Sequence, residues 1–125
     1  MCLSHPIIVN REAALERLGG DEELFLEVLD AFVQNFPLQI DELHAGIRED
    51  DRKLIQRIAH SIKSASASIG GGEISKVANV LESAALDQKL KFLQGQLEEL
   101  ESEFQRFTKF VHEQNWGSAS NTRSS

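Results

Sequence analysis

The stretch LIQRIAHSIKSASASIGGG, residues 54–72, decides how this chain of 125 residues folds. Its apolar residues recur at intervals of three and four, which places them along one face of an α-helix. They are Leu54, Ile58, Ile62, Ala65 and Ile69. Three glycines follow at positions 70–72, and glycine commonly ends a helix. The stretch therefore predicts an amphipathic helix over residues 52–69 that packs its apolar face against other helices.

Helical periodicity continues on both sides of this stretch. Asn10 is expected to cap a short helix that ends at the glycines 19–20, and Asp21 to cap a longer one that Pro37 ends. The predicted helices cover residues 10–18, 21–36, 38–49, 52–69, 74–87 and 88–111. Because no strand pattern interrupts them, the chain is predicted to be all-α, an antiparallel four-helix bundle with a short extra N-terminal helix.

The last of these helices carries a regular apolar seam that two structures could explain. Its apolar residues alternate in steps of three and four, namely Leu90, Leu93, Leu97, Leu100, Phe104, Phe107 and Val111. Such a seam can form a coiled coil with another chain, or the inner face of a bundle within one chain. Short loops elsewhere favour the bundle, because they join antiparallel neighbours.

The composition predicts one domain over residues 11–114, with a lead-in over 1–10 and a disordered tail over 115–125. The single Cys2 cannot form an internal disulfide, and the first residues lack the pattern of a secretory signal. No apolar run reaches the roughly 18 residues of a membrane span. We therefore expect a cytoplasmic protein without membrane contact, and a monomer.

The charge of the chain is unevenly distributed. The net charge is −7, which argues against a nucleic-acid-binding protein. Residues 1–50 hold three Lys or Arg against eleven Asp or Glu, and residues 78–125 hold five against seven. Residues 51–77 hold five against two and are the only positive third, so this segment could attract an anionic group or partner.

A histidine stands on the outer side of the predicted helix 52–69. At about 100° per residue, His60 lies opposite the apolar stripe and should face water. Its neighbours on that face are Arg57, Lys63, Ser64 and Ala67. The small residues beside it form either a low platform that lets a partner approach the imidazole or a close-packing surface between helices.

An exposed imidazole has chemistry that suits this position. One ring nitrogen of a neutral imidazole carries a free lone pair and can act as a nucleophile. A phosphoryl group on His60 would lie one helical turn from Lys63, whose ammonium could stabilise it. The hydroxyl of Ser64 could donate a hydrogen bond to the same group. His5, His44 and His112 lie on different segments without metal-ligand spacing, so no metal site is expected.

Three segments together carry a resemblance to a known family. RLGGDEELFLEVLDAFVQNFP (17–37) is followed by AHSIKSASASIGGGEI (59–74) and VANVLESA (77–84). The central motif is a histidine, a lysine three positions later and a glycine ten positions later, here His60, Lys63 and Gly70, and then a Leu-Glu pair at 81–82. Across residues 11–111 the chain resembles the histidine-containing phosphotransfer (HPt) domains of multistep two-component signalling.

The resemblance implies a role for each matching residue. His60 would accept the phosphoryl group and Lys63 would support it. Glu82 would orient the imidazole, unless it simply faces solvent. We expect Arg57, Ala67 and Gly70 to line the docking surface for a partner. Ser64 stands where the family usually has glycine, and its hydroxyl could either hinder docking or supply a hydrogen-bond donor.

The resemblance also implies a reaction and partners. A receiver domain of a response regulator, or of a hybrid sensor histidine kinase, would supply the phosphoryl group from an aspartate together with the Mg²⁺ ion. The chain would pass the group to a second receiver, with no cofactor and no kinase activity of its own. Two alternatives stay open: a phosphorylation-independent helical adaptor, and the phosphoacceptor domain of a chemotaxis-type histidine kinase.

Overall fold

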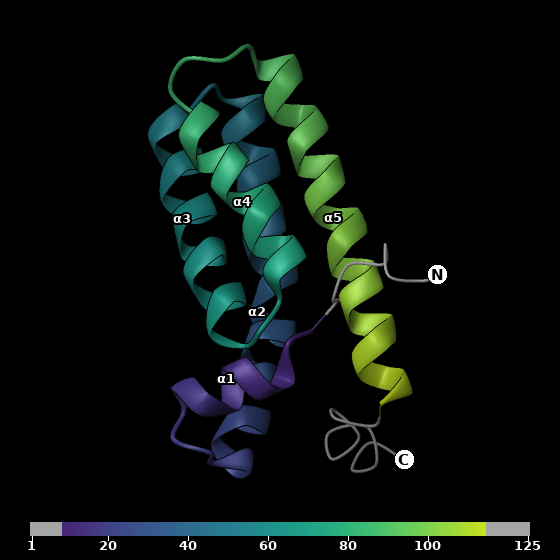
Figure 1. The fold of residues 1–125 in the computed structure, drawn as a ribbon. Helices are drawn as coiled ribbons and strands as arrows, with labels where there is room; N and C mark the ends of the chain where they lie inside the picture. The colour runs from purple at the N-terminus through teal and green to yellow at the C-terminus, as the bar shows by residue number, and fades with distance from the viewer. Residues whose placement is uncertain (1–8, 115–125) are drawn as a thin grey trace, which may run out of the picture.

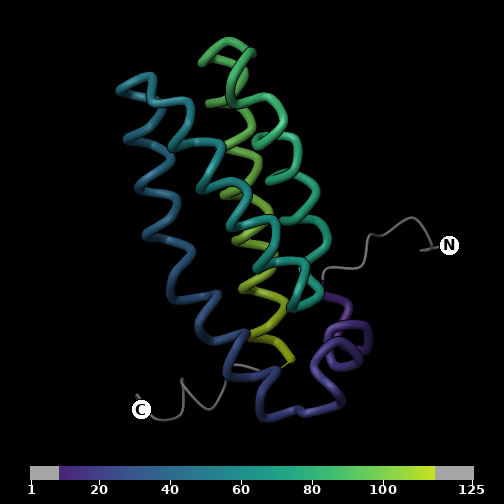
Figure 2. Tube along the Cα trace, turned by 90° about the vertical axis from the view of Figure 1, so that its left-hand side faces the viewer, coloured from purple at the N-terminus to yellow at the C-terminus, as the bar shows by residue number. Residues whose placement is uncertain are grey.

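The computed structural model describes residues 9–114, which form five helices and no strand (Figure 1). They are α1 (Arg11–Arg17), α2 (Glu22–Arg48), α3 (Arg52–Ser68), α4 (Gly72–Ala84) and α5 (Leu90–Glu113). Helices α2 to α5 run up and down in turn as an antiparallel bundle, and α1 lies beneath the turn between α3 and α4 (Figures 1 and 2). The predicted all-α bundle with a short N-terminal helix is confirmed. The predicted tail over 115–125 lies outside the described residues.

The starts of three helices are fixed by side chains next to them in the sequence. Asn10, Asp21 and Asp51 each accept a hydrogen bond from the backbone N–H three residues later, at 3.0–3.2 Å. Such caps satisfy one of the N–H groups that a first helical turn leaves without a partner. The predicted capping roles of Asn10 and Asp21 are confirmed.

Pro37 does not end a helix, contrary to the sequence-based prediction. Residues 22–48 form one continuous helix, so the separate helices expected over 21–36 and 38–49 are both parts of α2. A proline inside a helix removes one backbone hydrogen bond. The buried side chains of Phe36 and Ile40 on either side of Pro37 keep the same helical period, and their packing offsets that loss.

Aromatic contacts between α2 and α5 anchor the lower half of the core. The rings of Phe36 and Phe104 stack with centroids 3.9 Å apart, and Phe32 meets Phe107 edge-on at 5.5 Å. The apolar seam of α5 thus faces the inside of this bundle, which supports the single-chain interpretation over the coiled coil.

The inner face of α3 is rotated slightly from its predicted direction. Ile55, Ala59 and Ser66 are fully buried, whereas the expected Leu54 and Ala65 are only half-buried. The difference arises because small side chains let α4 approach α3 closely, so a serine enters the core. The hydroxyl of that Ser66 donates to the carbonyl of Ile62 at 2.6 Å and is therefore satisfied.

A glycine joins the short helix α1 to the end of α3. Gly70 has a φ of +79°, a conformation that glycine adopts without strain. Its carbonyl accepts a hydrogen bond from the backbone N–H of Asn10 at 2.8 Å, and a Cβ at Gly70 would overlap the backbone of Asn10. The start of α1 is thereby held against the α3–α4 turn.

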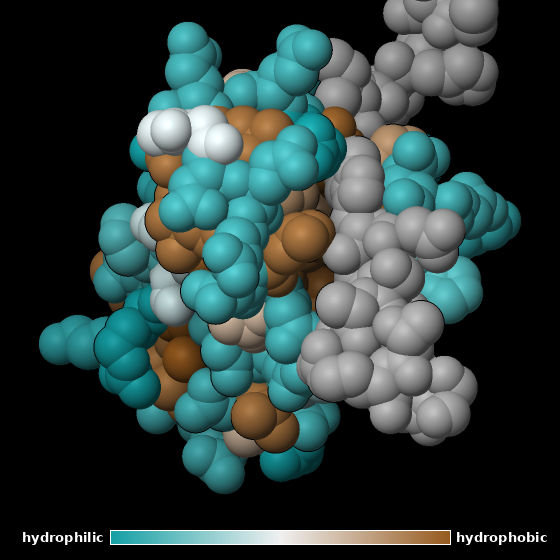
Figure 3. Space-filling view, turned by 90° about the horizontal axis from the view of Figure 1, so that it is seen from below, coloured by the Kyte–Doolittle hydropathy of each residue, from teal (hydrophilic) through white to brown (hydrophobic). Residues whose placement is uncertain are grey.

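The outer surface is mixed in character. Seen from below, apolar patches alternate with polar side chains wherever the described residues are in view (Figure 3). Within residues 9–114, no helix combines the length and the hydropathy that crossing a bilayer requires.

Candidate functional site

His60 projects from the outer side of α3. Its side chain is 60% exposed, on the helix face opposite the buried residues. The prediction that this histidine faces water is confirmed. An imidazole in this position can be reached by a second protein.

The carboxylate of Glu82 on α4 holds one side of the His60 ring. Nδ1 of His60 lies 2.8 Å from Oε2 of Glu82. An ionised carboxylate only accepts hydrogen bonds, so the contact favours the tautomer with its proton on Nδ1. The lone pair of the neutral ring is then on Nε2, the nitrogen that Glu82 does not contact. This geometry supports the predicted orienting role of Glu82, whose side chain is only 22% exposed.

The other oxygen of Glu82 binds the predicted phosphate-supporting lysine. Nζ of Lys63 lies 2.8 Å from Oε1 and forms an ion pair with it. Oε1 is buried from solvent, and the angles of this contact do not meet hydrogen-bond geometry. The same ammonium donates to Oδ1 of Asn79 at 3.4 Å. Asn79 was missed by the sequence interpretation, although it stands one helical turn before Glu82 and thus on the same face of α4.

The charges around Glu82 keep it ionised. The contact with Lys63 is the largest cause that lowers the pKa of the Glu82 carboxyl below its ordinary value; partial burial opposes it, and the hydrogen bond to His60 adds to it. An ionised Glu82 can serve the ring of His60 and the ammonium of Lys63 at the same time.

Close packing of α3 on α4 allows these short contacts. The hydroxyl of Ser75 on α4 donates to the carbonyl of Lys63 at 3.1 Å, which joins the two helices directly below the site. Ser66, buried on the same side of α3, adds no bulk between them. The small residues of α3 therefore bring Glu82 within reach of His60.

The run of small residues serves both purposes that its sequence suggested. Ser66 is buried between the helices, whereas Ser64 and Ala67 are exposed on the face of His60, as is Arg57. Gly70 is largely buried under Asn10, although it still lines a surface depression with Ala67 and Arg17, so its docking role stays a prediction. Its place in the motif is explained by the turn that ends α3.

The surface beside His60 extends onto α2. Nε2 of Gln39 donates to the hydroxyl of Ser61 at 3.2 Å, and the neighbouring Leu38 is 62% exposed. Neither α2 residue was predicted to be near His60, because the sequence does not show which helices adjoin α3.

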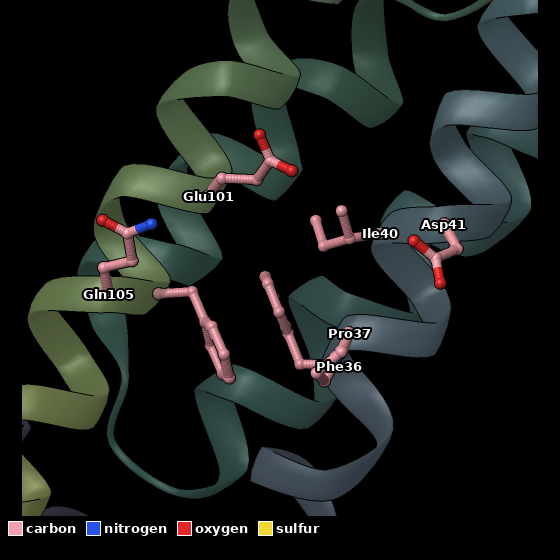
Figure 4. Close-up of a pocket in the computed structure, with 7 residues that line it drawn as sticks. Phe36, Pro37, Ile40, Asp41, Glu101 and Gln105 are labelled. Atoms are coloured by element: carbon pink, nitrogen blue, oxygen red, sulfur yellow. The ribbon is translucent and has the colours of Figure 1, made fainter.

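The groove drawn in Figure 4 lies elsewhere in the bundle. It measures about 400 Å³ between α2 and α5, with an apolar floor and carboxylates at its edges. Its lining residues are Phe36, Pro37, Ile40, Asp41, Glu101, Phe104 and Gln105. None of them belongs to the constellation around His60, which is a protruding surface and not a cavity.

Comparisons with known proteins identify the family and the fold. Residues 27–109 match the family model of the Hpt domain. The fold is similar to the crystal structure of histidine-containing phosphotransfer protein B (HptB) from Pseudomonas aeruginosa PAO1, with a TM-score of 0.78 and 21% identity over 88% of this chain and 96% of that one. It is also similar to the HPT domain of the Hpt sensor hybrid histidine kinase from Shewanella, with a TM-score of 0.74 and 18% identity over 86% and 93%. No curated protein sequence matches the chain.

The family match covers most of the described helices and includes the histidine, lysine and glutamate described above. Proteins of this family are phosphocarrier domains that partner with receiver domains and hybrid histidine kinases. The chain belongs to the Hpt domain family and serves histidine phosphotransfer in two-component signalling.

Proposed function

We propose that the chain carries a phosphoryl group on Nε2 of His60 from the aspartyl phosphate of one receiver domain to the aspartate of another. The observation that carries this proposal is the hydrogen bond between Nδ1 of His60 and Glu82, on an imidazole that is 60% exposed. It favours the tautomer with its lone pair on Nε2, which supports this nitrogen as the nucleophile.

The transfer step balances with the groups at hand. The lone pair of Nε2 attacks phosphorus, the new N–P bond forms, and the P–O bond to the receiver aspartate breaks to leave a carboxylate. The ring keeps its proton on Nδ1 and becomes a cation. The carboxylate of Glu82, 2.8 Å away, stabilises that positive charge. Return transfer to a second receiver reverses these bond changes.

Lys63 supports the phosphoryl group once it has arrived. Its ammonium is a flexible point charge that is held at the site by Glu82 and Asn79, one helical turn from His60. Reorientation of Nζ toward the phosphoryl oxygens would neutralise part of their charge. The hydroxyl of Ser64 lies on the same exposed face and can donate to them.

The remaining chemistry belongs to the partner. The receiver supplies the Mg²⁺ ion, and the chain needs no cofactor of its own. Its sequence holds no G-x-x-x-x-G-K-[ST] phosphate-binding run, in line with a carrier that has no kinase activity. We propose a cytoplasmic monomer whose phosphoryl donors include the receiver of a hybrid sensor kinase.

The experiment is phosphoryl transfer from a radiolabelled receiver phosphate. We expect an acid-labile, base-stable label that maps to His60 and is lost in His60→Gln. His112→Gln, which changes an exposed histidine at the end of α5, is the matched control and should keep the label. A chain that binds receivers but takes no label from any of them would be the phosphorylation-independent adaptor instead.

A further inference from the structure

Arg17 brings a positive charge from α1 to the face of α3 that carries His60. It is the last residue of α1, it is exposed, and its Nη1 donates to the carbonyl of Ala67 at 2.7 Å. This bond uses one of the five N–H donors of the guanidinium. We propose that Arg17 is a specificity-determining residue, which extends the receiver-docking surface from α3 onto α1 and pairs with an acidic side chain of the receiver. The inference rests on the proposed function and names a contact for it.

The distance along α3 places Arg17 within reach of a docked receiver. Ala67 follows His60 by seven residues, which is about 10 Å along the helix axis and within about 20° of the same face. A protein interface of ordinary size covers about 800 Å² on each partner, equal to a disc of about 16 Å radius. A receiver centred on His60 therefore covers Ala67 and meets the guanidinium bound there.

The arginine is held in place before any partner arrives. The backbone hydrogen bond from Asn10 to Gly70 fixes the start of α1, and the ion pair of Arg11 with Glu22 at 2.8 Å ties α1 to α2. The bond to Ala67 fixes the side chain itself. Because less side-chain freedom is lost on binding, a contact made by this arginine favours association more than one from a mobile lysine would.

The charge around Arg17 indicates an acidic partner group. Arg17, Arg57 and Lys63 lie on or at the border of the exposed face of α3, in a chain whose net charge is −7. Glu12 and Glu16 also lie on α1, but the bond of Arg17 to Ala67 places its charge on the side of α1 that meets α3. A receiver presents its phosphorylated aspartate toward this face, and an Asp or Glu at the edge of that surface complements Arg17.

A purely structural role for Arg17 makes different predictions. The carbonyl of Ala67 belongs to the last turn of α3 and also accepts a hydrogen bond from the backbone N–H of Gly70 at 3.2 Å, so Arg17 adds a second bond to this cap. An arginine that only capped this turn would affect the stability of the fold. It would leave the salt dependence of phosphoryl transfer unchanged.

The test is the rate of transfer from a phosphorylated receiver to Arg17→Glu, Arg17→Lys and Arg106→Glu. Arg106 is exposed on α5, away from α3, and makes only a 3.9 Å contact with Glu103, so it provides the same change of charge as a control. We expect kcat/KM to fall about tenfold in Arg17→Glu at low salt, with kcat unchanged. Arg17→Lys keeps the charge but loses the bond that holds it in place, so it should fall less than Arg17→Glu. Arg106→Glu should stay near the wild type, and the deficit of Arg17→Glu should vanish near 1 M salt.

Two results would overturn the inference. One is an equal kcat/KM for Arg17→Glu and Arg106→Glu. The other is a deficit that persists at 1 M salt and follows a lowered Tm. The inference and the proposed function fail separately: a wild-type chain that accepts no phosphoryl group from any receiver refutes the function, whereas normal wild-type transfer with an unaffected Arg17→Glu refutes only the role of Arg17. Labelling of His60 by phosphoramidate, a donor too small to reach Arg17, should be equal in all variants.

Discussion

Nδ1 of His60 lies 2.8 Å from Oε2 of Glu82, across the interface of α3 and α4. Glu82→Gln keeps an acceptor oxygen at this position and removes its charge, so the cationic ring formed by phosphorylation loses its counter-ion. Hydrogen bonds to charged groups contribute about 1.5–3 kcal/mol, which corresponds to a loss of about 10- to 100-fold in transfer rate. Single-turnover kinetics measure this loss.

The ring itself provides a second readout of the same contact. Nitrogen NMR of the wild type should show His60 protonated on Nδ1 in its neutral form, and Glu82→Ala should show a mixture of both tautomers. An unchanged tautomer together with an unchanged rate in Glu82→Ala would contradict the orienting role.

The ionised state of Glu82 makes the stability of the fold depend on pH. Because Lys63 and His60 lower its pKa in the folded chain, the unfolded chain binds this proton more tightly. The stabilisation is therefore complete above the ordinary glutamate pKa of about 4.3 and is lost as the pH falls through the lower folded value. Urea unfolding of the wild type and Glu82→Gln should give a difference in free energy that is constant above about pH 5.5 and shrinks in stronger acid.

Lys63→Met isolates the main cause of this pH dependence. Since Lys63 is the largest contribution to the shift, this variant should lose most of the acid-dependent difference while His60 stays in place. A Lys63→Met chain with the full wild-type dependence would show that another carboxylate is responsible.

Space above the imidazole is required for docking. Ser64 is exposed one turn beyond His60, so Ser64→Leu should place a bulky side chain beside the ring and slow transfer from a receiver at least tenfold. Labelling by phosphoramidate should be unaffected. Ser102→Leu, an exposed serine on α5, is the control and should transfer normally. Equal rates for the two variants would place the docking surface elsewhere.

Gly70 and Gly95 should respond in opposite ways to the same substitution. Gly70→Ala forces a Cβ onto the backbone of Asn10 at a φ of +79°, and we expect a loss of about 2 kcal/mol or more in the free energy of unfolding. At Gly95, inside α5, a Cβ meets open space, so Gly95→Ala should stabilise by about 0.5–1 kcal/mol. Thermal unfolding distinguishes them, and a stabilised Gly70→Ala would contradict the described junction of α1 with α3.

Pro37→Ala tests how α2 passes through its proline. Alanine restores the N–H that can bond to the carbonyl of Val33, and a proline inside a helix costs about 3 kcal/mol relative to alanine. We expect a gain of about 1–3 kcal/mol and a higher Tm. A lower Tm would instead mean that Pro37 itself is needed to seat Phe36 against Phe104.

Local chemistry explains which parts of this structure could be predicted from the sequence. The caps at Asn10 and Asp21 and the outward direction of His60 depend on neighbours within a turn or two, so spacing alone predicted them. The continuity of α2 did not follow from the sequence, because the local penalty of Pro37 is visible there and the packing of Phe36 and Ile40 that offsets it is not.

Contacts between helices formed the other class of missed features. Asn79 contacts Lys63, and Arg17 contacts Ala67, only because α4 and α1 lie beside α3. No periodicity within one segment shows which segments adjoin. Glu82 was found through the family motif rather than through its spacing. Gly70 was placed in the right motif, yet the burial that explains it depends on Asn10, sixty residues earlier in the chain.

His60 and Lys63 share the carboxylate of Glu82, and this bears on how a partner could distinguish the phosphorylated chain from the unphosphorylated one. When His60 is phosphorylated, we expect the ammonium of Lys63 to turn from the carboxylate of Glu82 to the phosphoryl group. The backbone hydrogen bonds at the α3–α4 turn and between Asn10 and Gly70 should not change. Under the proposed function we expect the phosphorylated and unphosphorylated forms to share one backbone structure. A partner that discriminates between these forms would then recognise the negative charge of the phosphoryl group on the ring and not a change of backbone conformation.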